Sequence, residues 1–278
     1  MRYQRVATEA ELLEVLSQSG ATILCGGTDL LIKMRAEMIQ PELLIDISRV
    51  KSLRGIRVEG SNLEIGAATL ESDIIHSPLV TEHVPLLGSV LRQLGSVQIR
   101  NRGTLGGNIV NASPAADGVI PLLLYATEIQ IVSADGERWV RLEDIFTGPS
   151  QTTLEPGEYV RTLRLPVPTA PFEPFYHKVG KRNALTIAIA SLGMLVHLEE
   201  GVIRQLRVAV GSVAPTPRRL RGLEEHLAGR SLDEHTIHEA RELAVASISP
   251  ISDVRATADY RRNVIGDLLV RALRSHAL

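Results

Sequence analysis

Residues 100–117 read RNRGTLGGNIVNASPAAD, and this stretch decides how the rest of the chain is interpreted. Its glycines, its amide side chains and Pro114 favour a long loop over a regular element. The polar groups of such a loop suit a phosphate or a flat ring with polar edges, or they satisfy the loop's own backbone. Long ordered loops in compact domains are more often functional. We therefore expect a ligand-binding loop here.

A second glycine pair occurs in residues 24–31, which read LCGGTDLL. It lies between an expected strand at 21–24 and a short helix at 30–36, and another strand follows at 43–47, which is the pattern of a βαβ unit. Gly26, Gly27 and the Thr28 hydroxyl suit a pyrophosphate, because glycine lets backbone N–H groups approach closely. Taken alone, the segment favours a plain strand-to-helix turn with a threonine cap, because short Gly-Gly turns are common. It matches neither GxGxxG nor the P-loop. Two such loops in one domain favour a dinucleotide ligand.

The composition is that of a soluble globular protein of about two domains, since the chain has 278 residues. With 30 basic against 32 acidic residues and only 3% aromatic residues, it lacks the charge and the stacking platforms of nucleic-acid binders. The single cysteine, Cys25, excludes an internal disulfide, an iron–sulfur cluster held by this chain alone and a structural zinc site. It also fits a reducing, cytoplasmic setting.

No membrane segment is expected. Residues 1–15 contain Glu9, Glu11 and Glu14 and have no apolar core, so they do not form a signal peptide. The longest uncharged and mostly apolar run, 184–196, is too short to span a bilayer.

Hydrophobic periodicity divides the chain near residue 170, where four prolines between 166 and 174 mark a linker. The first part is expected to contain helices at 9–19, 69–76 and 85–93, a hairpin of strands at 56–58 and 63–66, a buried segment at 119–125, and strands at 128–133 and 163–165. The second part is expected to contain strands at 186–198 and 202–210 and helices at 216–227, 232–248 and 256–276. This order predicts a small antiparallel sheet plus helices.

Both loops resemble those of a known family, the FAD-binding or medium subunits of the molybdenum hydroxylases, the group of xanthine dehydrogenase and carbon monoxide dehydrogenase. In that family an apolar strand precedes Gly-Gly-Thr-Asp-Leu-Leu, which residues 26–31 match. The second signature, Arg-Asn-x-Gly-Thr-Ile-Gly-Gly-Asn-Ile-x-Asn-Ala-Ser-Pro-x-x-Asp, matches residues 100–117 with Leu105 in place of isoleucine. Residues 175–184 and 255–262 resemble further family stretches, so the resemblance covers nearly the whole chain.

The resemblance implies an α+β fold. A two-part FAD-binding domain of the vanillyl-alcohol oxidase (PCMH) type would occupy residues 1–170, and a CO dehydrogenase flavoprotein C-terminal domain would occupy residues 171–278. FAD would bind non-covalently, with its phosphates against both loops. The implied cofactor-binding residues are Leu24, Cys25, Gly26, Gly27, Thr28, Asp29, Leu30, Thr104, Leu105, Gly106, Gly107, Asn108, Ser113, Asp117 and Lys178. Among them, Ser113 and Asp117 would serve the phosphate and the ribose or adenine, and Lys178 would reach the flavin. Cys25 replaces the alanine or glycine usual in the family, which implies a thiol beside the cofactor.

The implied role is electron transfer. A large subunit would carry molybdopterin, and a small subunit with [2Fe-2S] clusters would pass electrons through this FAD to NAD or another acceptor. The resemblance assigns no catalytic acid or base and no metal ligand to this chain. The expected holoenzyme is a xanthine or other N-heterocycle dehydrogenase, and a carbon monoxide dehydrogenase is the alternative.

Two other functions stay open: a free-standing flavin oxidase of the vanillyl-alcohol oxidase fold, and a scaffold that has lost its cofactor. Many such oxidases attach FAD through a histidine beside the glycine loop, and residues 26–31 and 100–117 contain none.

Several charged groups outside the loops have alternative interpretations. His235 and His238 lie at i and i+3 of an expected helix and form either half a metal site or an exposed face. Arg100, Arg102, Lys178, Lys181 and Arg182 form either a positive rim for an anionic cofactor or solvated charges. Arg218, Arg219 and Arg221 are expected at the start of a helix, on a face that is either on the surface or in contact with another subunit.

Overall fold

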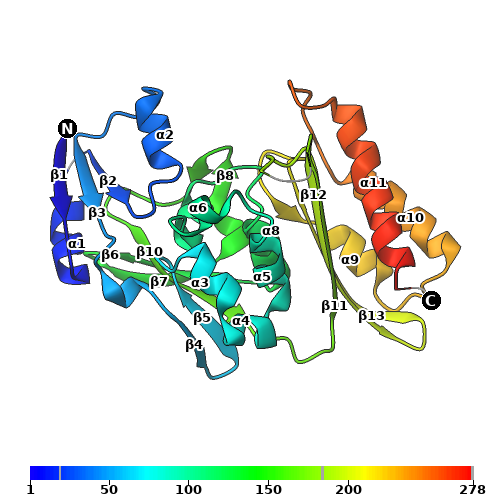
Figure 1. Ribbon diagram of the computed structural model, residues 1–278. Helices are drawn as coiled ribbons and strands as arrows, with labels where there is room; N and C mark the ends of the chain where they lie inside the picture. Colours follow the sequence, from blue (N-terminus) through cyan, green and yellow to red (C-terminus); the bar gives the residue numbers. More distant parts are fainter. Residues whose placement is uncertain (19, 183–184, 277–278) are drawn as a thin grey trace.

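The computed structural model describes residues 1–18, 20–182 and 185–276 (Figure 1). Several predictions include positions outside these residues, among them the last residues of the expected domain 171–278. Residue 19 ends the expected helix 9–19, residues 183 and 184 end the stretch 175–184 that resembles the family, and residue 184 begins the apolar run 184–196.

A three-stranded parallel sheet opens the chain, in the order β1 (Arg2–Arg5), β3 (Leu43–Asp46), β2 (Ala21–Leu24). Helix α1 (Glu9–Leu16) links β1 to β2, and α2 (Leu30–Arg35) links β2 to β3. The predicted strand, turn, helix and strand of residues 21–47 are thus confirmed. Helix α1 begins where the Thr8 side chain accepts the Glu11 N–H and ends at Leu16, earlier than expected.

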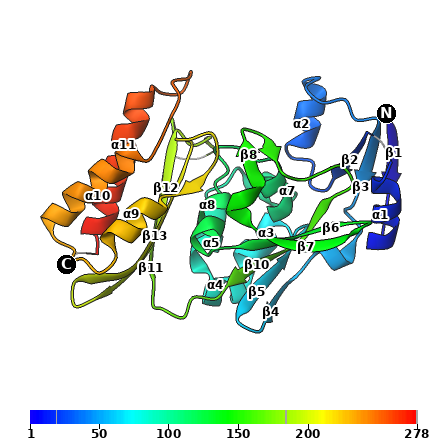
Figure 2. The ribbon, with the colours of Figure 1, turned by 180° about the vertical axis from the view of Figure 1, so that it is seen from behind.

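An antiparallel five-stranded sheet follows. Its order is β4 (Ile56–Glu59), β5 (Asn62–Gly66), β10 (Tyr159–Pro166), β6 (Glu128–Ser133), β7 (Gly136–Arg141). The predicted hairpin is β4–β5. The helices of this part are α3 (Glu71–His76), α4 (Pro78–His83), α5 (Pro85–Leu91), α6 (Val97–Arg100), α7 (Leu105–Val110) and α8 (Val119–Leu124). Their apolar sides share one core with the sheet, and Figures 1 and 2 show α5 and α8 between the sheet and the C-terminal strands.

Short elements connect these parts: the 3-10 turns η1 (Lys51–Leu53) and η2 (Leu142–Ile145), and the strand pair β8 (Phe146–Gly148) and β9 (Gln151–Thr152). The prediction missed β1, β7, β8 and β9, and also the helices α4 and α6.

The expectation of an irregular loop across residues 100–116 is wrong in its middle, where α7 runs from Leu105 to Val110. The helix forms because the Thr104 hydroxyl accepts the N–H of Gly107 at 3.2 Å and caps its first turn. The fold requires glycine at position 106, because a Cβ there would lie only 2.7 Å from Cβ of Ala67. The glycine therefore permits close packing of α7 on the chain that leaves β5.

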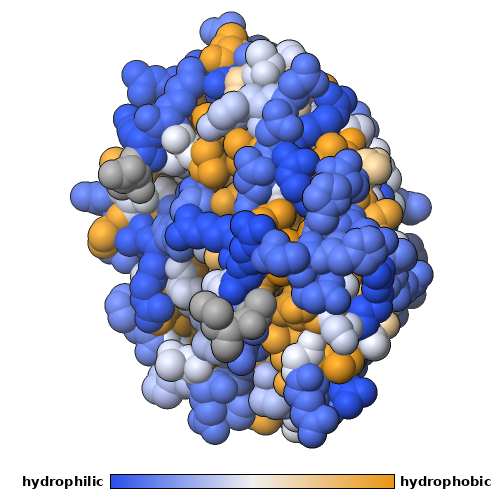
Figure 3. Space-filling view, turned by 90° about the vertical axis from the view of Figure 1, so that its right-hand side faces the viewer, coloured by the Kyte–Doolittle hydropathy of each residue, from blue (hydrophilic) through white to orange (hydrophobic). Residues whose placement is uncertain are grey.

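The C-terminal part has an antiparallel sheet in the order β11 (Glu173–Val179), β12 (Ala190–Glu199), β13 (Val202–Gly211), β14 (Arg218–Arg219). Helices α9 (Arg221–Leu227), α10 (Glu234–Ala246) and α11 (Ala258–Arg274) pack against it around a second core. This confirms the expected small sheet plus helices, although β11 was not foreseen. Figure 3 views this end of the molecule, where hydrophilic residues cover most of the surface.

The surface assignment of Arg219 is wrong. Arg218 and Arg219 form strand β14, which pairs with Ala209 and Val210 at the edge of the sheet. The Arg219 guanidinium lies 2.6 Å from the Glu224 carboxylate, and both side chains are below 10% exposed. These arginines form a short strand that pairs with the edge of β13. Hydrophobic periodicity does not predict such a strand.

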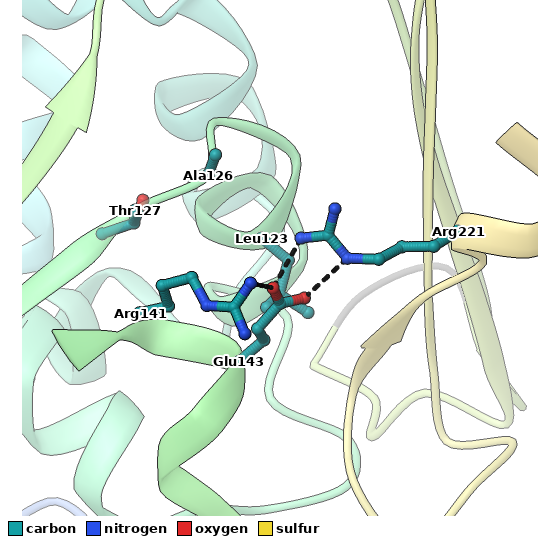
Figure 4. A pocket seen from close by; sticks show the side chains of 6 residues that line it. All are labelled: Leu123, Ala126, Thr127, Arg141, Glu143 and Arg221. Atoms are coloured by element: carbon teal, nitrogen blue, oxygen red, sulfur yellow. Dashed lines mark hydrogen bonds and ion pairs between the residues drawn. The ribbon is translucent and has the colours of Figure 1, made fainter. Parts of the chain in front are cut away.

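Polar contacts join the two parts of the chain. Figure 4 shows Arg221 of α9 and Arg141 of β7 converging on Glu143 of η2, at 2.5 and 3.4 Å. The cavity beside them measures about 30 Å³, which is room for one water molecule. These ion pairs therefore connect the two parts of the chain, and the cavity beside them is too small to be a ligand site.

Among the residues that the structure describes, no helix combines the length and the apolar character needed to cross a bilayer.

Candidate functional site

The two glycine loops lie in direct backbone contact. A Cβ on Gly26 would stand 2.1 Å from the carbonyl oxygen of Arg102 and 3.2 Å from Cα of Gly103. Farther along, Lys33 Nζ of α2 donates to Asn111 Oδ1 at the end of α7, at 2.5 Å. Two segments about eighty residues apart in sequence thus form one structure, and only glycine fits at their closest point.

The first loop presents free hydrogen-bond donors. None of the five consecutive amides from Gly26 to Leu30 donates a hydrogen bond to any residue that the structure describes. Gly27 has a φ of +73°, a left-handed conformation that favours glycine. Successive free N–H groups in such a turn form a concave site for an anion. The donor set therefore fits the phosphates of a dinucleotide.

Cys25 follows β2 and is half-buried beside Thr104. Burial raises the pKa of its thiol, and the neighbouring Arg54 opposes that rise. A thiol with a raised pKa is mostly protonated at neutral pH and is a poor nucleophile. Cys25 therefore acts as a small, weakly polar side chain and not as a nucleophile.

The remaining residues of the second loop have separate surroundings. Leu105 is fully buried in the main core and so contributes packing. Gly107 is exposed, and Asn108 is half-buried beside it on α7. The Ser113 hydroxyl accepts the Ala115 N–H at 3.2 Å and thus shapes the turn that follows α7.

The far end of the second loop joins the C-terminal sheet. Lys178 Nζ lies 2.8 Å from Asp117 Oδ2, and these side chains are 6% and 8% exposed. Tyr176 donates its hydroxyl to Asp117 Oδ1 at 3.0 Å, and Lys178 also donates to the Gln93 carbonyl at 2.8 Å. Burial raises the pKa of Asp117, while the charge of Lys178 opposes that rise. Burial and the nearby Asp117 likewise hold the pKa of Tyr176 well above its usual value. Sequence reasoning named Asp117 and Lys178 separately and missed their pairing, which only the fold reveals.

A cavity of about 500 Å³ opens beside this pair, between the two parts of the chain. Gln93 and Gly95 line one side of it, and His177, Lys178 and Arg182 line the other. Its volume is in the range of cofactor pockets. Burial and the charge of Arg271 lower the pKa of His177, which favours its neutral form.

The expected positive rim is only partly assembled. Lys178 and Arg182 reach the cavity. Arg100 donates to the carbonyls of Leu94 and Gly95, at 2.7 and 3.3 Å, and so closes the turn before α6. The five cations therefore do not form a single cluster. Sequence reasoning also missed Arg92 and Gln93, which line the same cavity and carry no motif.

Glu71 lies beneath the second loop and was also missed. It is 2% exposed, and its Oε2 has no hydrogen-bond partner among the described residues. A Cβ on Gly103 would stand 2.9 Å from that oxygen. Burial raises the pKa of Glu71 to about 7, against the opposing charge of Arg100. No sequence signal separates Glu71 from an ordinary first-turn glutamate of a helix.

We expect the chain to lose stability as the pH rises from about 4.5 to about 7. In that window the unfolded chain releases the Glu71 proton while the folded protein keeps it, so unfolding is favoured. The full shift corresponds to about 3 kcal/mol. Urea unfolding at pH 5 and pH 8 measures the loss. Glu71→Gln should reduce the difference and the exposed Glu242→Gln should not, and an unchanged difference in Glu71→Gln would contradict the assignment.

His235 lies on the outer face of α10, 3.4 Å from Glu239. Within residues 1–18, 20–182 and 185–276, no group of three His, Cys, Asp or Glu side chains is arranged to hold a metal ion.

Comparison with known proteins agrees with this geometry. The family described as the FAD binding domain in molybdopterin dehydrogenase matches residues 1–168, and the CO dehydrogenase flavoprotein C-terminal domain matches residues 175–276. The chain is 35% identical over 277 residues to the carbon monoxide dehydrogenase medium chain of Hydrogenophaga pseudoflava, covering 98% of this chain and 96% of the relative. It is 32% identical to a putative xanthine dehydrogenase FAD-binding subunit of Escherichia coli, covering 95% of this chain and 91% of the relative.

The fold agrees as well. A solved structure of carbon monoxide dehydrogenase from Hydrogenophaga pseudoflava superposes with a TM-score of 0.94 at 33% identity, covering 99% of this chain and 96% of that chain. The expected fold, a two-part FAD-binding domain followed by a flavoprotein C-terminal domain, is thereby confirmed. The chain belongs to the molybdenum hydroxylase family, as one of its FAD-binding medium subunits.

Proposed function

We propose that this chain transfers electrons: it receives them from iron–sulfur clusters of a partner subunit and passes them through its FAD to NAD or another acceptor. The observation that carries the proposal is the row of five free amides, Gly26 to Leu30, in contact with the second glycine loop. Such donors, which have no partner among the residues that the structure describes, suit a diphosphate.

When bound, FAD would supply the redox chemistry, and the protein would bind it and orient it. The free amides of the first loop would hold the phosphates. Thr104 fixes the start of α7, and Gly107 and Asn108 of that helix would help to hold the phosphates. The proposed ligand set keeps the fifteen residues expected from the sequence: Leu24, Cys25, Gly26, Gly27, Thr28, Asp29, Leu30, Thr104, Leu105, Gly106, Gly107, Asn108, Ser113, Asp117 and Lys178. No catalytic acid or base is part of the proposal.

The cavity beside Lys178 is the proposed place of the flavin ring. The buried pair Asp117–Lys178 holds its wall in place, because it ties β11 to the second loop. His177, favoured in its neutral form, adds no charge that would attract water into the cavity. We also propose that the boundary between the two domains falls near residue 170.

The proposed partners are a large subunit with molybdopterin and a small subunit with [2Fe-2S] clusters, in the cytoplasm. We favour a holoenzyme that oxidises xanthine or another N-heterocycle. A carbon monoxide dehydrogenase is the second candidate, and the 35% identity to such a medium chain supports it. Assays of the assembled complex with xanthine and with carbon monoxide distinguish the two.

The first test is a visible absorption spectrum of the purified chain after FAD is added and the free cofactor is removed by gel filtration. We expect a retained flavin spectrum, with free FAD released on denaturation. A chain that stays colourless even in a complex purified from its source would contradict the proposal. Bleaching of the flavin by NADH in that complex tests NAD as the acceptor.

A further inference from the structure

Gly103 contacts the first glycine loop and a buried carboxyl at the same time. A Cβ on Gly26 would stand 3.2 Å from Cα of Gly103. A Cβ on Gly103 itself would stand 2.9 Å from Oε2 of Glu71 and 3.1 Å from Cδ of the same carboxyl. The Glu71 carboxyl therefore packs directly on the backbone of Gly103. Any movement of this carboxyl reaches the closest contact between the two glycine loops through a single residue.

Backbone hydrogen bonds fix Glu71 beside the second loop. Glu71 is the first residue of α3, and its N–H donates to the carbonyl of Gly103 at 3.0 Å. Two residues earlier, the carbonyl of Thr69 accepts the N–H of Leu105 at 3.2 Å. These bonds hold the start of α3 in register with the loop. A change at the Glu71 side chain therefore acts on Gly103 and is not absorbed by a shift of the helix.

The Glu71 carboxyl is buried, and one of its oxygens has no hydrogen-bond partner. The residue is 2% exposed, and no described residue donates to Oε2. An ionised carboxylate in such a place is costly unless donors or water reach it. Burial accordingly raises the pKa of Glu71 to about 7. Near neutral pH the chain is therefore a mixture of molecules with a neutral and with a charged Glu71.

Besides burial, two charged side chains act on Glu71. Arg100 of α6 opposes the rise in the pKa of Glu71, although its guanidinium is engaged with the carbonyls of the turn before α6. Asp117 reinforces the rise, and it is itself paired with Lys178. The other charged or titratable side chains on α3 and on the segments beside it are Asp73, His76, Glu82, His83, Arg92 and Arg102. A bound diphosphate adds negative charge to the loops and so favours the neutral form of Glu71 further.

We propose that Glu71 is a positioning residue for the cofactor: its neutral carboxyl holds Gly103 against the first loop, so that the binding of FAD takes up one proton. The inference rests on the proposed function and adds to it the residue through which pH controls cofactor affinity. Glu71 is not among the fifteen proposed ligands, and it acts on FAD through Gly103.

Ionisation of Glu71 works against the contact between the loops. A carboxylate requires donors or water, and its place against Gly103 offers no donor to Oε2. The charged group is solvated only if water enters or Gly103 moves away. Gly103 then separates from Gly26, and the row of free amides loses its support from the second loop.

The test measures the dissociation constant of FAD by fluorescence titration of the full chain at pH 5 and pH 8. If the chain alone does not retain FAD, its complex with the partner subunits is titrated instead. Glu71→Gln keeps the shape of the neutral acid and cannot ionise. Glu242→Gln is the matched control, because the Glu242 side chain is 61% exposed on α10. Circular dichroism at both pH values checks that each variant is folded.

We expect the wild-type dissociation constant to be about tenfold higher at pH 8 than at pH 5, because only about a tenth of the molecules then carry a neutral Glu71. Glu242→Gln should show the same dependence. Glu71→Gln should bind FAD equally well at both pH values, and as tightly as the wild type does at pH 5. This rescue at pH 8 distinguishes the proposed role from a merely structural one, since a variant that only damages the fold binds FAD more weakly.

A second variant covers the case in which Glu71→Gln does not fold. Arg100→Gln removes the charge that opposes the rise in the pKa of Glu71, so the midpoint of the pH profile should move to higher pH. An unmoved midpoint would overturn the inference, as would a folded Glu71→Gln with the wild-type profile or equal wild-type affinity at pH 5 and pH 8. In each of these cases FAD still binds and the proposed function stands. A wild-type chain or complex that binds no FAD at either pH would instead defeat the proposed function.

Discussion

Gly26→Ala should abolish FAD retention. The new Cβ would lie 2.1 Å from the Arg102 carbonyl oxygen, and that neighbour is backbone, which cannot rotate away. The two glycine loops must then separate, and the row of free amides that begins at Gly26 loses its shape. A loss of about 3 kcal/mol in binding corresponds to a dissociation constant more than a hundredfold higher. Fluorescence titration of the purified variant with FAD measures it.

Gly222→Ala is the matched control. Gly222 lies in helix α9, and a Cβ there would meet no atom within 4 Å. We expect unchanged FAD binding and a small gain in stability, because alanine favours a helix more than glycine by about 1 kcal/mol. If Gly26→Ala folds and binds FAD as tightly as Gly222→Ala does, the contact between the loops does not form the site.

Lys178→Met should destabilise the chain by about 3–5 kcal/mol, because it leaves the buried carboxyl of Asp117 without its charged partner. The effect is large since both side chains are below 10% exposed and water replaces neither. Urea unfolding at pH 7 measures the loss. Adding Asp117→Leu to this variant should recover much of the stability, because the double variant buries no unpaired charge.

An exposed ion pair supplies the control for this experiment. Arg204 lies 2.9 Å from Glu199, and these side chains are about half exposed. Arg204→Met should therefore cost no more than about 1 kcal/mol. Equal losses in Lys178→Met and Arg204→Met would mean that the Asp117–Lys178 pair does not hold the two parts of the chain together.

The sequence predicts the elements whose signals are local. The βαβ unit of residues 21–47 and the strands around the turn at 199–201 both follow from apolar periodicity and glycine positions. Helix α7 was missed because its two glycines disfavour a helix in isolation, whereas Ala67 beneath Gly106 and the cap from Thr104 stabilise one in the fold. Tertiary contact overrides propensity at this position.

The candidate site likewise has one part that the sequence predicts and another part that only the fold reveals. Both glycine loops could be found from their spacing, because a phosphate requires small residues close to backbone donors. The Asp117–Lys178 pair and Glu71 depend on segments that meet only in three dimensions. No pattern within either segment predicts that these charged side chains are buried.

Strand β10 has a consequence for how the chain is made. It is the last of its sheet to be synthesised, yet it lies in the middle, between β5 and β6. Its Tyr159 and Arg161 also reach back to Glu9, at 2.6 Å each. Until residue 166 has left the ribosome, β5 and β6 each expose an unpaired edge, and such edges invite aggregation. The nascent chain therefore passes through a vulnerable stage, and slow translation before residue 159 would prolong it, whereas a pause just after β10 would let the sheet close first.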